Sequence, residues 1–292
     1  MIGDMDRARK YEADKIVLLG LFAVGLLIAQ ILTVSRYTGP QKQGTKVIAE
    51  IKRKGISSFF PERQGRSFFV IRDAADRTAG FTADVVGPAA PPYKLGIQSA
   101  ALLYARPRYR KEQLMSFKSD ERFSTFSWKS EVVISGRRSR KELLLGDDGV
   151  LTIGESGQSR KRGYTPAEHS IPDALLDLVF SQMLDSGYKK IIVDAIDSDG
   201  QTTEVAIRQT RTVGPGALSG LPEYELNVIF LDRRRSSQQV HLDADKRISG
   251  ISLQQDPKYE FERTTLEEVL RRVPEAARYI APMLTASEPN QP

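Results

Sequence analysis

The chain has 292 residues, and 43 Lys and Arg residues against 37 Asp and Glu residues give it a formal net charge of +6. A surplus this small, spread along the chain, does not indicate a nucleic-acid binder. The absence of cysteine excludes disulfide bonds, thiolate chemistry and a lipoprotein anchor.

The segment from Ile16 to Val34 is the strongest local signal in the chain. It reads IVLLGLFAVGLLIAQILTV and carries no charge and one amide, that of Gln30. Its nineteen residues match the ~20 apolar residues that cross the hydrocarbon core of a bilayer as a helix. The residues that we assign to this transmembrane helix include Ile16, Leu19, Phe22, Leu26, Ile28 and Val34. The sequence therefore predicts a single-pass membrane protein whose helix contacts membrane lipid.

Two other interpretations of this segment fit less well. A cleaved signal peptide has an apolar core of about 7–15 residues and a small-residue cleavage site, whereas this run is longer and no Ala-x-Ala pattern follows it. A buried core helix at a chain end would keep a polar face for water. Lys and Arg flank the segment almost evenly, so they do not fix its orientation. Because a long domain is translocated largely regardless of loop charge, we expect the body on the extracytoplasmic, periplasmic side.

Changes in composition along the chain predict five segments. They are a short polar tail at 1–15, the transmembrane anchor at 16–34, a linker at 35–46, a β-rich body at 47–286 with a potential subdivision near 155–170, and a flexible tail at 287–292. Gly39, Pro40 and Gly44 mark the linker, because Gly and Pro interrupt regular structure.

Apolar runs rich in β-branched and aromatic residues predict about ten strands in the body. A first short strand is expected at Val47 to Ile51, and Phe68 to Ile71 with Phe81 to Val86 is expected as a hairpin. The stretch from Tyr93 to Tyr104 fits a long strand or a short helix. Tyr224 to Phe230 alternates apolar with polar side chains, which is typical of a half-buried strand. The turn signals between these runs favour antiparallel hairpins.

Two helices are predicted from capping residues. Ser170 is a candidate N-cap, apolar residues then recur at helical spacing, and Gly187 marks the end of that helix. Near the C-terminus, Thr264 and Glu267 form a capping box before a second helix. The expected fold class is therefore α+β and mostly β: the transmembrane helix is followed by an antiparallel curved sheet, half-barrel or sandwich, with a few helices.

No motif predicts a catalytic, cofactor or metal site. The sequence has no GxSxG, Walker A or dinucleotide-binding pattern. His169 and His241 are the only histidines, and no HxxxH pair or cysteine accompanies them. The run Asp197 to Gly200 is expected to be a hairpin turn, because Ala195 stands where a calcium loop has an oxygen ligand. We therefore expect no catalytic residue, no cofactor and no metal ion.

Short basic clusters recur along the body. They are Lys52–Lys54, Arg106–Lys111, Arg137–Lys141, Arg160–Arg162 and Arg233–Arg235. Such residues at strand ends and turns are ordinarily solvated or protect sheet edges. The alternative is that several line one end of the sheet and attract anionic lipid head groups, at about 1 kcal/mol each. Nucleic acid is not expected as a partner, because Tyr109 is the one aromatic residue among these basic residues.

The order of elements between Ile171 and Leu253 carries a resemblance. A helix ends near Gly187, a strand covers Ile191 to Asp194, a DG turn follows, and a later strand leads into the run Leu242-Asp243-Ala244-Asp245-Lys246-Arg247. This order resembles poorly characterised exported bacterial proteins with a curved antiparallel sheet, similar in architecture to lipoprotein-carrier-like half-barrels. The resemblance covers about a third of the chain and implies no catalytic residue.

The function that we expect is that of a membrane-anchored, non-enzymatic cell-envelope protein whose β-rich body binds a lipid or other apolar ligand. One alternative is a structural or assembly subunit that acts through protein–protein contacts with an envelope partner. A second alternative is a hydrolase with an unrecognised site. An open, curved sheet with an apolar concave face would favour ligand binding, whereas a closed, packed core would favour a scaffold. The sequence does not indicate the oligomeric state.

Overall fold

The computed structural model describes residues 38–59, 65–106, 109–155, 162–212, 224–231, 236–253 and 258–286. The predicted membrane segment Ile16–Val34 and the predicted tail at 287–292 lie outside these residues. Among the helices that the structure describes, none has the length and apolar character needed to span a bilayer. The transmembrane assignment therefore stays a prediction from the sequence.

The described residues form fifteen strands in one sheet. The strands are β1 (Gly65–Asp73), β2 (Thr78–Pro88), β3 (Leu95–Arg106), β4 (Tyr109–Ser119), β5 (Phe126–Ile134), β6 (Arg137–Leu145), β7 (Leu151–Glu155), β8 (Arg162–Tyr164), β9 (Ser170–Pro172), β10 (Lys190–Ile196), β11 (Thr202–Thr212), β12 (Tyr224–Phe230), β13 (Ser237–Leu242), β14 (Ile248–Leu253) and β15 (Tyr259–Thr264). Their order is β8-β7-β6-β5-β4-β3-β2-β1-β15-β14-β13-β12-β11-β10-β9. Two antiparallel meanders, β1–β8 and β10–β15, thus join where β1 pairs with β15, and β9 pairs with β10 in parallel.

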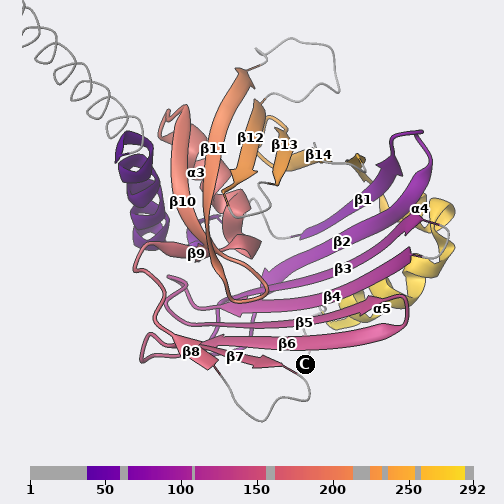
Figure 1. The fold of residues 1–292 in the computed structure, drawn as a ribbon, viewed down its shortest axis with the longest axis horizontal. Helices are drawn as coiled ribbons and strands as arrows, with labels where there is room; N and C mark the ends of the chain where they lie inside the picture. Colours follow the sequence, from indigo (N-terminus) through magenta and orange to yellow (C-terminus); the bar gives the residue numbers. More distant parts are fainter. Residues whose placement is uncertain are drawn as a thin grey trace, which may run out of the picture.

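The sheet is strongly curved, which brings its two ends close together (Figure 1). Two contacts of side chains connect these ends. The Lys141 ammonium on β6 lies 2.6 Å from the Asp199 carboxylate in the β10–β11 turn. The Tyr164 hydroxyl on β8 donates a hydrogen bond of 2.9 Å to the Gly200 carbonyl in the same turn. Because β8 and β9 remain the terminal strands of the hydrogen-bonded order, the sheet is open and curved, as the predicted half-barrel requires.

Helical segments cover both faces of the sheet. They are the helical residues 38–54, η1 (Ile56–Phe59), η2 (Asp173–Leu175), α3 (Leu176–Asp185), α4 (Leu266–Arg272), η3 (Pro274–Ala276) and α5 (Ala277–Ala286). Helix α3 lies in the concavity, whereas α4 and α5 lie against the other face of β1–β3 (Figure 1).

The alternation of side chains along β2 separates two apolar cores. Phe81, Ala83 and Val85 pack with α4 and α5 in a smaller core on the outer face. Asp84 and Val86 point the opposite way, into the concavity. The larger core fills much of that concavity with residues of the β-strands, of α3 and of the helical residues 38–54.

The structure corrects the predictions for the first residues of the body. Residues 38–54 are helical, where the sequence suggested the end of a linker and a strand at Val47 to Ile51. Val47, Ile48 and Ile51 are almost fully buried on one side of this helix, so their spacing has the helical period and not that of a strand. Gly44 lies on the same side against β10, where a Cβ atom would come within 1.9 Å of the Ile192 carbonyl oxygen.

Both predicted caps are also corrected. Ser170 belongs to β9, and α3 begins after the 3₁₀ turn η2 with Leu175 as its N-cap. The cap of α4 is Thr265, one residue later than predicted, and its side chain accepts the backbone N–H of Glu268 at 3.2 Å. The ambiguous stretch at Tyr93 to Tyr104 is mostly strand β3.

Candidate ligand-binding cavity

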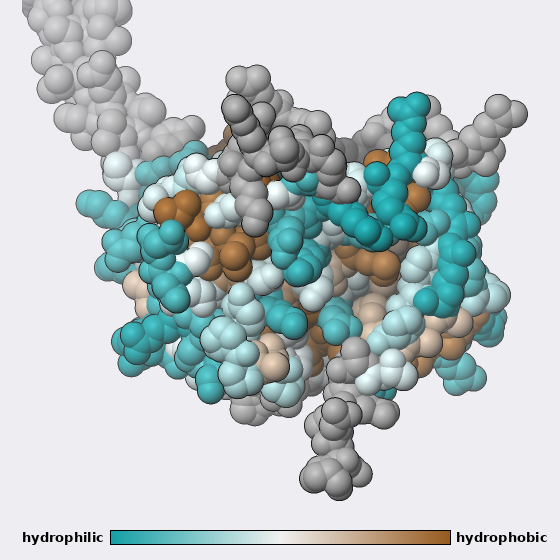
Figure 2. Space-filling model, turned by 90° about the horizontal axis from the view of Figure 1, so that it is seen from below, coloured by the Kyte–Doolittle hydropathy of each residue, from teal (hydrophilic) through white to brown (hydrophobic). Residues whose placement is uncertain are grey.

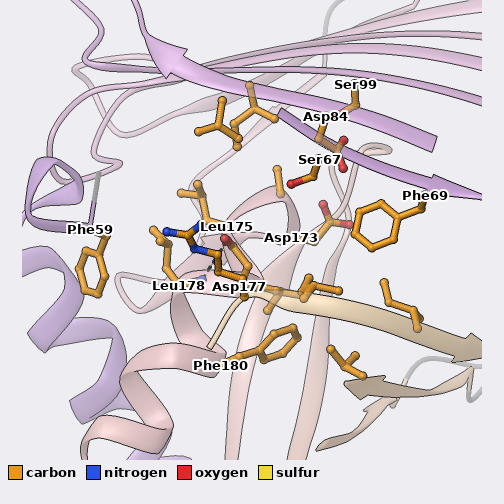
Figure 3. Close-up of a pocket in the computed structure, with 18 of the residues that line it drawn as sticks. Phe59, Ser67, Phe69, Asp84, Ser99, Asp173, Leu175, Asp177, Leu178 and Phe180 are labelled. Atoms are coloured by element: carbon orange, nitrogen blue, oxygen red, sulfur yellow. Dashed lines mark hydrogen bonds between the residues drawn. The ribbon is translucent and has the colours of Figure 1, made fainter. Parts of the chain in front are cut away.

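A cavity of about 450 Å³ lies between the concave face of the sheet and α3. It is bordered by η1, by the strands β1–β4 on one side, and by β12–β15 on the other. Figure 3 shows Leu175, Leu178 and Phe180 entering it from the helical side, with Phe69 on the strand side. The volume falls in the range of small-molecule sites, about 300–1,000 Å³.

Most of the cavity wall is apolar. Its larger apolar side chains are Ile56, Phe59, Phe69, Val86, Leu95, Ile97, Met115, Leu175, Leu176, Leu178, Phe180, Phe230, Val240, Ile248 and Ile251. They come from both meanders, from α3 and from the 3₁₀ turns η1 and η2, so the wall exists only when the sheet has curled. A wall of this kind favours an apolar chain or ring over a polar solute.

Four oxygen-bearing side chains interrupt this apolar wall (Figure 3). They are Asp84 from β2, Ser99 from β3, Ser67 from β1 and Asp173 from η2. We call these four residues the carboxyl pole. The Ser99 hydroxyl donates a hydrogen bond to Asp84.

Burial raises the pKa of both carboxyl groups of the pole. The pKa of Asp84 rises from its ordinary 3.8 to about 6, chiefly because the group is removed from bulk water. The Ser99 hydrogen bond opposes this rise and the negative charge of Asp177 adds to it. Burial likewise raises the pKa of Asp173 to about 7, with a further contribution from the charge of Asp197. Both groups therefore exchange protons near neutral pH.

Three arginines also border the cavity: Arg66 on β1, Arg247 before β14 and Arg263 on β15. Arg66 is exposed. The Arg263 guanidinium donates to the Asp243 carboxylate at 3.3 Å. The Arg247 Nε is buried and has no hydrogen-bond partner among the described residues. The wall thus carries both signs of charge, at different places.

A second hollow of about 700 Å³ lies on the outer face of the sheet beside α5. Arg278, Tyr279, Pro282 and Met283 form its helical side, and charged side chains of β5–β7 form much of its floor. Seen from below, the molecule is mainly hydrophilic, with apolar residues in patches between the hydrophilic ones (Figure 2). The lining of the outer hollow thus includes a larger share of charged residues than that of the inner cavity.

Several side chains of the basic clusters are paired where the structure describes them. Arg138 and Arg140 on β6 both pair with Glu131, at 2.9 and 2.6 Å. In the first cluster, the Lys52 ammonium donates to the Glu168 carbonyl oxygen at 2.6 Å. The cluster at 233–235 and residues 160 and 161 of the cluster at 160–162 lie outside the described residues. These pairs partly neutralise the charge of two clusters, which weakens the alternative of head-group attraction there.

The histidines and the candidate calcium loop lie apart from the cavity wall. His169 is exposed, and His241 is a residue of β13. Among the residues that the structure describes, no group of three or more His, Asp or Glu side chains is arranged to hold a metal ion. Asp197 begins the β10–β11 turn, where its carboxylate accepts the backbone N–H groups of Asp199 and Gln201 at 2.9 and 2.8 Å. The structure thus confirms the hairpin turn.

Sequence reasoning did not find the carboxyl pole. Asp84 and Asp173 are far apart in the chain, and neither belongs to a motif. The one local signal is Asp84 within the apolar β-strand pattern at Phe81 to Val86, where a carboxylate on an inward-facing position is uncommon. The signal is weak, because a strand exposes alternate residues to solvent as often as it buries them.

Comparison with known proteins identifies a fold and no family. No family model matches the chain, and no curated protein matches it. The chain is similar to the crystal structure of a β-barrel-like protein of a domain of unknown function, DUF1849, from Brucella abortus. The TM-score is 0.52 at 10% sequence identity, over 68% of this chain and 95% of that chain. This likeness supports the curved half-barrel part of the resemblance, without its link to lipoprotein carriers; the chain has a mostly β, β-barrel-like fold.

Proposed function

We propose that this chain is a membrane-anchored envelope protein that holds an apolar or amphipathic ligand in the cavity between its curved sheet and α3. The observation that carries the proposal is the cavity of about 450 Å³ with a mostly apolar wall, inside a sheet that is open and curved. A scaffold that acts only through its surface has no need of such a space, because an unfilled apolar cavity costs stability.

The membrane anchor is the second part of the proposal. It is supported by the nineteen apolar residues of Ile16–Val34. The helical residues 38–54 begin four residues after this segment and are packed into the body, so a membrane helix there would hold the body close to the bilayer. A body held in this way would receive an apolar ligand directly from lipid, on the periplasmic side that the sequence favours.

The test of ligand binding uses the full chain in lipid nanodiscs and a neutral photoreactive probe, a 12-carbon alcohol with a diazirine in its chain. We expect irradiation to label peptides of the cavity wall, read by mass spectrometry. Ile97→Trp places a larger side chain in the cavity, so it should lower the labelling of those peptides at least fivefold.

Leu144→Trp is the matched control, because the same residue type is introduced at a side chain that is 43% exposed on β6 and does not border the cavity. It should leave the labelling unchanged. Labelling spread evenly over the body, or equal in the two variants, would contradict the proposal.

The test of the anchor is extraction of membranes with alkaline carbonate. We expect the full chain to stay in the membrane pellet, because about 20 buried apolar residues hold it there. A variant lacking residues 16–34 should be released. A full chain that is itself released by carbonate would show that the segment does not span the bilayer.

A further inference from the structure

Two arginines of the cavity wall lie beside each other at one end of the sheet. The Arg263 guanidinium donates to one oxygen of the Asp243 carboxylate at 3.3 Å, and the other oxygen accepts the backbone N–H of Arg247 at 2.8 Å. Both arginines border the cavity. Asp243 therefore joins the residue that precedes β14 to the end of β15, and we call Arg247 and Arg263 the arginine pair.

The register of the sheet directs Arg263 into the concavity. Arg263 lies opposite Phe69 across β15 and β1, and directly opposed residues of antiparallel strands point to the same face. Phe69 enters the cavity (Figure 3). The bond from Arg263 to Asp243 is longer than the about 2.7–2.9 Å of close charge-assisted pairs, and a guanidinium has five N–H donors. Arg263 thus keeps donors for a ligand, next to an aromatic ring.

The Arg247 guanidinium has an unsatisfied donor. Its Nε is buried and has no hydrogen-bond partner among the described residues, and neither bond to Asp243 involves this guanidinium. The Nε of Arg72 is also unpartnered, but that guanidinium donates to Asp76 at 2.8 Å and lies 2.5 Å from Glu262. An unpaired buried donor costs free energy, so an acceptor that enters the cavity beside Arg247 would be stabilised there.

The carboxyl groups of the wall come from other elements. Asp84 is on β2, which β1 separates from β15, so the strands of Asp84 and Arg263 are about 10 Å apart. Asp173 belongs to η2. With pKa values of about 6 and about 7, both groups are ionised at pH 8 and repel anions. A preference for an anion at that pH would therefore have to come from the arginine pair.

We infer that the arginine pair binds the anionic head group of a single-chain amphiphile, a carboxylate or a phosphate, while the chain lies against the apolar wall. The inference rests on the ligand-binding function proposed above and names the head group. A guanidinium offers a planar fork of N–H donors that matches two oxygens of a carboxylate or a phosphate. The volume of about 450 Å³ is at the lower end of small-molecule sites, which fits one chain better than two.

The test compares four head groups on the same 12-carbon chain. Dodecanoate, dodecyl phosphate, dodecanol and dodecylamine compete with the photoreactive alcohol for the full chain in phosphatidylcholine nanodiscs at pH 8, where the carboxylic acid is ionised. Each compound is compared between protein variants, so its partition into lipid cancels. Arg247→Gln and Arg263→Gln should each raise the concentration of the bound anion that displaces the label, by roughly tenfold. The anion with the larger change identifies the head group as carboxylate or phosphate.

Dodecanol should displace the label equally from the parent chain and from both variants, and dodecylamine should displace it no less well from the variants. Arg77→Gln is the matched control, because Arg77 pairs with Asp73 at 2.7 Å in the exposed β1–β2 turn and does not border the cavity. It should leave displacement by both anions unchanged.

Anions that displace the label equally well from the parent chain, Arg247→Gln and Arg263→Gln would overturn the inference and leave the proposed function standing. A loss for dodecanol as large as that for the anions would also overturn it, because the effect would then not depend on the head group. Absence of cavity labelling by the photoreactive alcohol in the parent chain would overturn both.

Discussion

At the scale of single residues, Asp84 couples the stability of the protein to pH. Its pKa in the folded protein is about 6 against an ordinary 3.8, so between pH 4 and 6 the folded protein holds a proton that the unfolded chain has lost. Stability must therefore fall as the pH rises through that window. Asp84→Asn keeps the size of the side chain and its contact with Ser99. Because asparagine does not ionise, the substitution removes this fall in stability with rising pH.

We expect Asp84→Asn to unfold at the same temperature as the parent chain at pH 4 and at a higher temperature at pH 8. A rise in pKa to about 6 corresponds to ~3 kcal/mol at most, and water in the cavity should reduce the gain to about 1–2 kcal/mol. Thermal unfolding of both proteins from pH 4 to 8 measures the difference. Asp147→Asn, in the exposed β6–β7 turn, should show no such trend, and a destabilised Asp84→Asn at pH 8 would contradict the account.

At the scale of elements, residues 38–54 are helical, although the sequence predicted a linker and a short strand there. The pattern Val47, Ile48, Ile51 is too short to distinguish a strand from a helix by period, and Gly39, Pro40 and Gly44 suggested a linker. The structure gives Gly44 another role. Its missing side chain lets the helix approach β10, which is a tertiary contact that no local propensity reveals.

Gly44→Ala should therefore destabilise the body. The added Cβ would overlap the Ile192 carbonyl, at a cost of roughly 1–3 kcal/mol that exceeds the ~1 kcal/mol gained from helix propensity. Gly39→Ala makes the same change in the same helix with no atom within 4 Å of the new Cβ, so it should be neutral or stabilising. Denaturant unfolding compares them, and equal midpoints would show that this close approach does not matter.

At the scale of the whole molecule, the contact between the sheet's two ends maintains the curl that encloses the cavity. The Tyr164 hydroxyl donates a hydrogen bond of 2.9 Å to the Gly200 carbonyl oxygen and lies 3.1 Å from the Thr202 hydroxyl. Tyr164→Phe should cost about 1 kcal/mol. It should also speed amide exchange in β7, β8 and the β10–β11 turn.

Tyr109→Phe is the control for that change, because its ring is 36% exposed at the start of β4. Hydrogen exchange followed by mass spectrometry should show no faster exchange in this variant. If Tyr164→Phe left β7 and β8 as protected as before, the two ends would be held by other contacts, such as the ion pair of Lys141 with Asp199.

The hairpins and the curved, mostly β architecture could be predicted, because alternation and turn residues are local. Phe68–Ile71 and Phe81–Val86 do pair, in β1 and β2. The cavity could not be predicted, because its wall joins strands of both meanders that meet only after β1 pairs with β15. The anchor at Ile16–Val34 stays a prediction. It is a stronger local signal than any pattern in the sequence of the body.

The central claim is that the cavity holds a ligand. A crystal structure of the full chain, purified from its own membranes, tests this most directly. We predict elongated density for a chain-like molecule along Leu178 and Phe180. Density for water alone, or side chains closed over an empty space in that cavity, would contradict the account.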